Sequence, residues 1–182
     1  MGVVYLQKKF EGTVNTIETY LSAWFINQYI PSGAGVHYAT FESAVHGFVH
    51  ANDLRALRKK LFKTRLPKLQ PKLEEKGTLH KADVHKKWSL SVPTADYSVI
   101  MRSQRHFYEN DKERPVQLRS YHSFDSLISA LKIIVTGIMF NALTKYECGK
   151  NMLLNHPKFF TFGYASHEGP THERNENTVF ET

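Results

Sequence analysis

One long apolar segment, residues 126–154, constrains the fold more than any other part of this sequence. It reads SLISALKIIVTGIMFNALTKYECGKNMLL, and its apolar side chains recur at helical spacing. The members of this stripe are Leu127, Leu131, Ile134, Val135, Ile138 and Ala142. A membrane-spanning helix needs about 20 apolar residues with few or no charges, and Lys132 lies inside the run. The segment therefore predicts one long apolar helix, which either belongs to the core and covers a sheet or lies in the plane of a lipid surface.

A shorter, basic helix is predicted over residues 54–65. Leucines recur along one side at helical spacing, and the opposite side is densely basic. The basic residues are Arg55, Arg58, Lys59, Lys60, Lys63 and Arg65. Such a face is ordinarily solvated, but it also suits anionic lipid headgroups or phosphates, and each basic residue near an anionic surface contributes on the order of 1 kcal/mol. Lys59, Lys60 and Lys63 are therefore candidates for contact with a lipid surface.

The charge of the whole chain favours an anionic partner. Lysine and arginine number 24 against 17 acidic residues, which gives a net charge of +7. An excess of this kind suits a membrane surface, a phosphate or a nucleic acid. The basic helix has neither interleaved aromatic residues nor a nucleic-acid-binding motif, so nucleic acid is not predicted as a partner.

The rest of the chain alternates between strand-like and helix-like patterns. Strands are expected at residues 13–25, 88–92 and 116–122, with the start of another at 178–180, and helices at 1–10, 37–50 and 96–110. For residues 96–110 a strand is the alternative interpretation. Residues 66–87 combine prolines, charges and a glycine, which predicts a surface loop. A chain of 182 residues is long enough to bury a normal core. These patterns predict a single α+β domain over residues 1–182.

Residue spacing alone identifies no active site. Gly33 and Gly35 resemble part of a dinucleotide-binding loop, but the third glycine and the surrounding βαβ unit are absent from the pattern. His46 and His50 share a helix face without a third ligand at metal-binding spacing, so no metal site is predicted. Cys148 is the only cysteine, which excludes an intramolecular disulfide and favours a reducing compartment.

Several runs of sequence together carry a resemblance that spacing does not. They are MGVVYLQKKFEGTVNTIETYL, ATFESAVHGF, NDLRALRK, ADYSVIMRSQRHFYEN, PVQLRSY and HPKFFTFGYASHEGPT. In this order they resemble the saccharopine dehydrogenase-like oxidoreductases, in the branch of animal proteins found with lipid droplets. The resemblance implies an α+β domain with an antiparallel sheet, which in the family follows an N-terminal dinucleotide-binding domain. This chain matches the second domain, so NAD(P) is implied for full-length members and no cofactor is expected in this chain.

The resemblance also assigns family positions residue by residue. Thr40 and Ser43 match the Thr and Ser of a Gly-Thr-aromatic-x-Ser motif at the domain interface, although Ala39 replaces its glycine. Arg102 and Ser103 match a polar pair on a following helix, and Gly169-Pro170 matches a Gly-Pro turn.

The apolar segment matches the family's hydrophobic segment, which implies attachment to a lipid droplet or membrane on its cytoplasmic side. The residues expected to face lipid are Leu131, Ile134, Val135 and Ile138. Lys132 and Asn141 make this version of the segment more polar than the family's.

Two hypotheses of different classes follow. In the first, the chain is the substrate- and lipid-facing domain of an NAD(P)-dependent oxidoreductase and is not catalytic by itself. Its partner would then be the missing dinucleotide-binding domain. In the second, the chain is a non-catalytic interaction module for lipid droplets or membrane surfaces. A homo-oligomer is compatible with both hypotheses.

Overall fold

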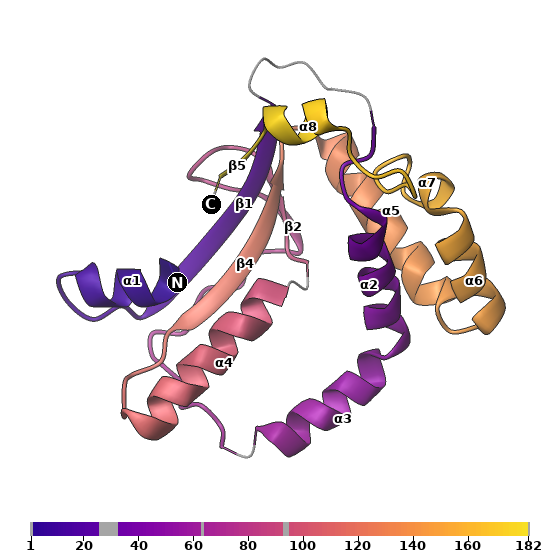
Figure 1. Cartoon of the computed structure of the whole chain (residues 1–182). Coiled ribbons are helices and arrows are strands. Elements are labelled where there is room, and N and C mark those ends of the chain that lie inside the picture. The colour runs from indigo at the N-terminus through magenta and orange to yellow at the C-terminus, as the bar shows by residue number, and fades with distance from the viewer. Residues whose placement is uncertain (1, 26–32, 63, 93–94, 182) are drawn as a thin grey trace. The chain divides into compact units, whose positions relative to one another are not determined.

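The computed structural model describes residues 2–25, 33–62, 64–92 and 95–181. They form two compact units (Figure 1), which are described separately below. Unit 1 comprises Met1–Ser22, Thr64–Asp125 and Glu181–Thr182, and unit 2 comprises Ala23–Lys63 and Ser126–Phe180. The predicted α+β class is confirmed by a sheet and helices in the described chain. The expectation that residues 1–182 form a single domain stays a prediction.

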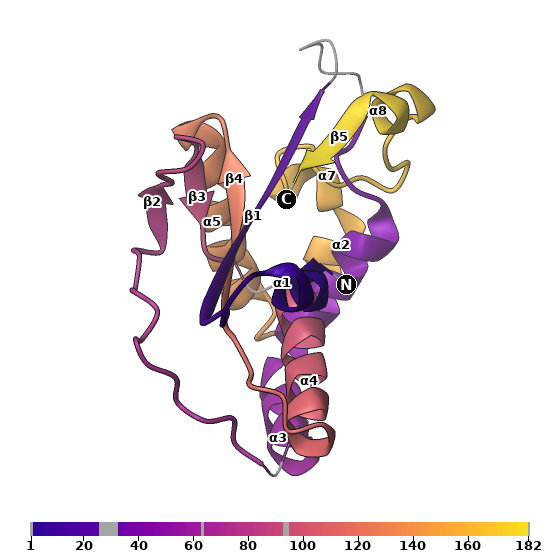
Figure 2. The same cartoon turned by 90° about the vertical axis from the view of Figure 1, so that its left-hand side faces the viewer.

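Unit 1 is built on a sheet with two flanking helices. Its elements are α1 (Gly2–Lys9), most of β1 (Thr16–Phe25), β2 (Leu79–Lys81), β3 (Trp88–Leu90), α4 (Ala95–Asn110) and β4 (Gln117–Phe124). Within unit 1 the strand order is β2-β3-β4-β1. The remaining strand, β5 (Thr178–Glu181), belongs mainly to unit 2. Figure 2 shows β2, β3 and β4 side by side, with residues 64–78 leading to β2 as an extended chain. The predicted loop 66–87 therefore contains a short strand.

The prediction of an antiparallel sheet is wrong for its longest pair of strands. β1 and β4 run parallel, with Thr16 opposite Gln117 and Ser22 opposite Ser123, whereas β3 is antiparallel to both β2 and β4. Parallel neighbours need a long crossover connection, and the chain between β1 and β4 supplies one. Alternation of apolar and polar residues identifies a strand, but it does not encode the direction of its neighbour.

The parallel register separates the sheet into an apolar and a polar face. Ile17 is opposite Leu118, and both pack with Val3 and Val116 in the buried core of unit 1. Side chains alternate between the two faces of a strand, so Glu18, Tyr20 and Ser22 of β1 lie on the other face. Gln104 of α4 is buried at the core, where its side-chain oxygen accepts from the backbone N–H of Val116 at 3.0 Å.

Unit 2 is helical. It contains α2 (Tyr38–Val49), α3 (Ala51–Leu61), α5 (Leu127–Leu143), α6 (Glu147–Asn155), α7 (Pro157–Phe160) and α8 (His172–Asn177). Its core joins α2, α5, α6 and the segment after them. The buried members are Phe41, Val45, Phe140, Leu153, Phe160 and Ala165.

The predicted long apolar helix over residues 126–154 is wrong, because the segment forms two helices. α5 ends at Leu143, where the Thr144 hydroxyl donates to the carbonyl of Phe140 at 2.6 Å, and α6 begins at Glu147. The end of α5 lies so close to Gly149 of α6 that a Cβ atom there would overlap the Leu143 carbonyl. Among the described residues, no helix has the length and apolar character needed to cross a membrane. Within unit 2, α5 packs against α2 and α6 in a helical cluster, and the alternative that it covers a sheet stays a prediction.

We predict that Leu153→Ala destabilises the chain by about 2–5 kcal/mol, because Leu153 is completely buried in the core of unit 2 and its loss leaves a cavity. Chemical denaturation followed by circular dichroism measures the loss. The matched control is Leu61→Ala on α3, where the side chain is exposed and the expected change is within about 0.5 kcal/mol. Equal effects of the two substitutions would contradict the packing described for unit 2.

Candidate functional site

The exposed side of α5 carries most of the residues predicted to face lipid. Ile138 is 65% exposed, Leu131 45% and Val135 44%, whereas Ile134 is half-buried. Leu127 and Ile128 extend this exposed apolar face toward the start of the helix. The buried side of α5 is instead formed by Ala130 and Phe140. The stripe predicted from helical periodicity is therefore mainly a surface, because the helical core of unit 2 uses the other side.

α3 presents both its basic and its apolar side to solvent. Every residue of the helix is exposed, including Lys59 and Lys60. Leu54, Leu57 and Leu61 are also exposed, so the basic face and the apolar face are both available. The third predicted lysine, Lys63, lies outside the described residues.

Two of the family positions, Gly169 and Pro170, form the Gly-Pro turn in unit 2. Gly169 has φ of +74°, a conformation that favours glycine, and a Cβ there would crowd His37 just before α2. Pro170 forms an isolated β-bridge with Gly33. The Gly-Pro turn thus holds the segment that leads into α2, whose exposed face carries Thr40 and Ser43.

The other predicted pair lies on α4 of unit 1. Arg102 is exposed, and the Ser103 hydroxyl donates to the carbonyl of Val99 at 3.3 Å within the same helix. The proposed roles of Thr40, Ser43, Arg102, Ser103 and the Gly-Pro turn stay predictions.

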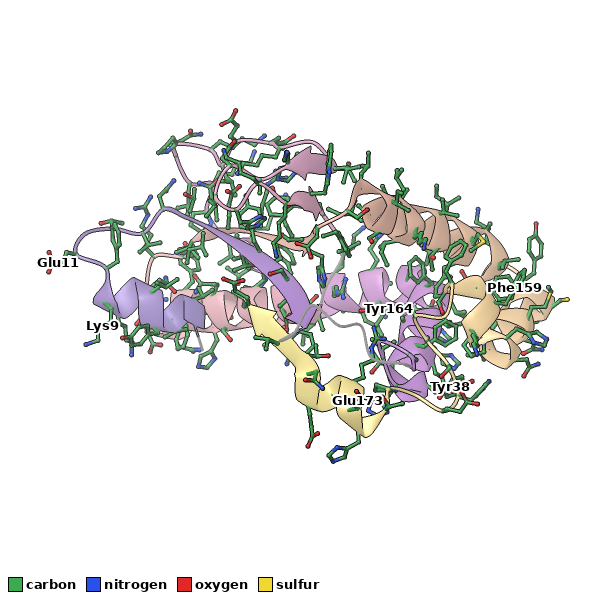
Figure 3. All side chains as sticks on the ribbon, turned by 90° about the horizontal axis from the view of Figure 1, so that it is seen from above. Lys9, Glu11, Tyr38, Phe159, Tyr164 and Glu173 are labelled. Atoms are coloured by element: carbon green, nitrogen blue, oxygen red, sulfur yellow. The ribbon has the colours of Figure 1, made fainter. Side chains whose placement is uncertain are left out.

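A shallow depression of about 430 Å³ lies beside the Gly-Pro turn, lined in part by His156, Lys158, His167 and Glu168. The ring of His167 stacks on Tyr38 with centroids 4.2 Å apart. Figure 3 shows Tyr38 and Tyr164 in this part of unit 2. Polar side chains line the depression without a buried charged group among them, so it is a surface feature rather than a built catalytic pocket.

The glycine loop before α2 does not fit a phosphate cradle. The N–H of Gly35 donates to the carbonyl of Tyr164 at 2.7 Å, and that of Ala34 to the carbonyl of Gly169 at 3.4 Å. A dinucleotide-binding loop needs such N–H groups directed at the pyrophosphate. Here they hold the loop to the segment that contains Tyr164 and Gly169 instead. The expectation that this chain carries no cofactor stays a prediction.

A polar cluster that spacing did not reveal lies on the polar face of the unit 1 sheet. Lys76 Nζ donates to Glu18 Oε2 at 2.6 Å and to Tyr20 Oη at 2.8 Å, and Tyr20 Oη donates to the same Glu18 oxygen at 3.0 Å. The Lys76 and Glu18 side chains are only 26% and 22% exposed. The triad fastens residues 64–78 to β1. Glu18 and Tyr20 share a strand face in the sequence pattern, but nothing local assigns Lys76 to them.

The cluster shifts the pKa values of Tyr20 and Lys76. Burial raises the pKa of Tyr20, the hydrogen bond from Lys76 acts against that rise, and Glu18 adds to it. The hydrogen bonds to Glu18 and Tyr20 raise the pKa of Lys76. Lys76 therefore stays protonated, and Tyr20 keeps its proton beyond the pH at which an ordinary tyrosine loses it.

Further aromatic and imidazole groups extend the cluster. Tyr121 stacks on Tyr20 with centroids 5.1 Å apart, and His80 meets Tyr121 edge-on at 4.8 Å. Among the described residues, three buried atoms of these side chains have no hydrogen-bond partner: Glu18 Oε1, His80 Nε2 and Tyr121 Oη. Buried polar atoms of this kind are commonly satisfied by internal water.

A Ser-His pair next to the cluster has the wrong tautomer for nucleophilic catalysis. His85 Nε2 lies 3.1 Å from Ser123 Oγ, as in a catalytic dyad. The backbone N–H of Lys87, however, donates to His85 Nδ1 at 3.1 Å, so in the neutral ring the proton resides on Nε2. A base must accept the serine proton at Nε2, and here that nitrogen is a donor. The pair is structural.

His46 and His50, the pair for which no metal site is predicted from the sequence, stack with ring centroids 6.3 Å apart on α2 and its C-terminal cap. Within residues 2–25, 33–62, 64–92 and 95–181, no group of three His, Cys, Asp or Glu side chains is placed to hold a metal ion.

The structure thus defines an α+β chain that exposes an apolar helix face in unit 2 and holds a Lys-Glu-Tyr cluster in unit 1. Comparison with known proteins places it beside one family. A human saccharopine dehydrogenase-like oxidoreductase is 32% identical over 180 residues, covering 99% of this chain and 41% of the relative. A probable mitochondrial saccharopine dehydrogenase-like oxidoreductase of Arabidopsis thaliana is 26% identical, covering 99% of this chain and 44% of the relative.

A third relative, from Caenorhabditis elegans, is described as a lipid droplet localized protein and is 25% identical over 94% of this chain and 40% of its own length. No family model matches the chain, and no solved structure matches it. The predicted resemblance to saccharopine dehydrogenase-like oxidoreductases is confirmed, and the chain is homologous to about two-fifths of their length. This share agrees with the predicted match to a single domain of those proteins.

We predict opposite shifts of the Tyr20 pKa in two variants. The Glu18 carboxylate raises the Tyr20 pKa, so Glu18→Gln should lower this pKa. The Lys76 hydrogen bond lowers the Tyr20 pKa, so Lys76→Gln should raise this pKa further. NMR titration of the tyrosine Cζ resonances measures both shifts, with exposed Tyr5 as the internal control. Because the folded pKa is raised, the contribution of Tyr20 to stability is present below the ordinary tyrosine pKa and is lost as pH rises through the folded value. Shifts of the same sign in both variants would contradict the described triad.

Proposed function

We propose that this chain acts as the substrate- and lipid-facing domain of an NAD(P)-dependent saccharopine dehydrogenase-like oxidoreductase. The observation that carries this proposal is the exposed apolar face of α5, formed by Leu127, Ile128, Leu131, Val135 and Ile138. The similarity to oxidoreductases over 99% of the chain supports the enzyme class. The chain spans about two-fifths of those relatives, so NAD(P) binding and hydride transfer are assigned to the region that it does not match.

The α5 face supports contact with lipid because large apolar side chains are costly to leave in water. Fully burying one isoleucine, leucine or valine side chain contributes about 1.5–3 kcal/mol, and five such side chains share this face. A helix lying in the interface needs no span across the membrane. Lys132 is exposed beside this face, with its Nζ 5.9 Å from the centre of the Phe162 ring. A lysine in this position can extend its charged end to the headgroups while its stem stays in the apolar layer.

α3 supports the second hypothesis, a non-catalytic module that binds the surface of a lipid droplet or membrane. Its exposed leucines and the exposed Lys59 and Lys60 have the arrangement of an in-plane amphipathic helix. The lipid droplet name of the Caenorhabditis elegans relative supports a lipid droplet location for this chain, and we propose the cytoplasmic side of that surface. In this hypothesis lipid-surface binding through α3 and α5 is the whole function of the chain. Self-association into a homo-oligomer would add avidity for that surface.

We predict that Leu131→Asp and Ile138→Asp each reduce recovery on triglyceride droplets coated with phosphatidylcholine by about tenfold or more, since each removes a buried apolar side chain from the lipid contact and adds a charge. Flotation through a sucrose gradient measures the bound fraction. Val84→Asp is the matched control, because Val84 is 83% exposed and lies in unit 1. Undiminished flotation of both α5 variants would contradict the proposed contact of this face with lipid.

Charge variants on α3 separate the two lipid-contacting elements. Lys59→Glu and Lys60→Glu should weaken binding to droplets that contain phosphatidylserine by on the order of 1 kcal/mol per lost positive charge, while leaving binding to neutral droplets almost unchanged.

The enzyme hypothesis is tested separately by transplanting the chain into the human relative in place of its matching region. Retained NAD(P)H turnover would favour the domain, and a complete loss with intact folding would favour the module.

A further inference from the structure

Unit 1 contains an apolar pocket that neither the family positions nor the proposed lipid-facing residues explain. It has a volume of about 250 Å³ and lies between residues 64–78, α4 and the first half of β4. Leu66, Leu69 and Leu73 form one wall, and Met101, Val116 and Leu118 form the other. The three leucines are only half-buried, and the opposite wall is part of the core of unit 1. The pocket therefore gives a small apolar group direct access to that core.

The mouth of this pocket is basic. Lys72 and Arg119 line it, and both pair with the carboxylate of Glu75, at 3.1 Å and 3.4 Å. Two positive charges thus share one negative charge, which leaves a net charge of +1 among these three groups. These contacts also lower the pKa of Glu75, with the Lys72 hydrogen bond as the largest cause. Glu75 is itself 65% exposed, so a second anion can reach the same two cations.

The backbone around the pocket is fixed on both sides. The side-chain oxygen of Gln117 accepts from the N–H of Leu73 at 2.9 Å, and the side-chain nitrogens of Gln117 and Asn15 donate to the carbonyl of Pro71 at 2.8 and 2.9 Å. The Lys76 triad holds the following residues to β1. The leucine wall is therefore positioned by polar contacts of its backbone, some of them made by Gln117 at the edge of the pocket, and its leucine side chains line the cavity.

We propose that this pocket binds a single-chain anionic amphiphile, with the apolar chain against the leucine wall and the anionic headgroup on Lys72 and Arg119. An apolar cavity with a few convergent polar groups is the usual form of a small-molecule site. The net positive mouth selects an anion over a neutral or cationic headgroup. The pocket belongs to unit 1, whereas α3 and α5 belong to unit 2, so this proposal does not rest on the proposed lipid contacts.

Binding of sodium octanoate, octyl phosphate and octanol to the full 182-residue chain tests this proposal, with the Met101 methyl resonance as the local probe and calorimetry for affinity. Octanoate should shift the Met101 signal and bind more tightly than octanol. Arg119→Gln should weaken octanoate binding by about fivefold, the size expected for an exposed ion pair, and should leave octanol unchanged. Octyl phosphate binding in place of octanoate would assign the headgroup to phosphates and retain the anionic site.

Glu75→Gln makes the decisive comparison, because it removes the anion that competes for Lys72 and Arg119. Octanoate should then bind about fivefold more tightly, a gain that a purely structural role of Glu75 would not produce. Leu69→Asn should abolish binding of both octanoate and octanol, whereas Val84→Asn, at an exposed position, should leave binding unchanged. Circular dichroism checks that each variant is folded. Three results would each overturn the proposal: neither octanoate nor octyl phosphate binds more tightly than octanol, the anion that does bind is insensitive to Glu75→Gln, or neither anion shifts the Met101 signal.

Discussion

The parallel pairing of β1 with β4 is the constraint on which unit 1 depends. Its register puts Ile17 beside Leu118 and Tyr20 beside Tyr121, on opposite faces of the same two strands. The first pair belongs to the core, and the second is the centre of a polar and aromatic face. A shift of one residue in this register would exchange the two faces, so burial of Ile17 and Leu118 also fixes the position of Glu18 and Tyr20.

The polar face in turn positions residues 64–78. Lys76 reaches Glu18 and Tyr20 from a segment without regular structure, and the Gln117 side chain fixes Leu73 and Pro71 further along the same segment. A half-buried ion pair is a weak source of stability unless its remaining hydrogen bonds are satisfied, and Tyr20 supplies one of them. The result is a leucine wall placed opposite α4 and β4, where it lines the apolar pocket.

In unit 2 the important constraint is the choice of which side of α5 is buried. Periodicity predicted its apolar stripe correctly as a pattern, but both sides of this helix are largely apolar, so the pattern did not tell the core side from the surface side. Phe140 selects the buried side by packing edge-on against Phe41 and Phe48 of α2. The side that bears Leu131, Val135 and Ile138 is then left exposed, and this exposure is the basis for the proposed lipid contact.

The sequence by itself determined the elements whose signal is local. The predicted helices at 1–10, 37–50 and 96–110 and the predicted strands at 13–25 and 116–122 agree with the structure to within a few residues, because periodicity and capping act over one or two turns. The family was also recognisable from runs of residues. Only the tertiary structure decided the parallel direction of β1 and β4, the break after Leu143 and the cluster around Tyr20. These features depend on contacts between distant residues, such as Lys76 and Glu18, which are 58 positions apart, and no local pattern encodes such a contact.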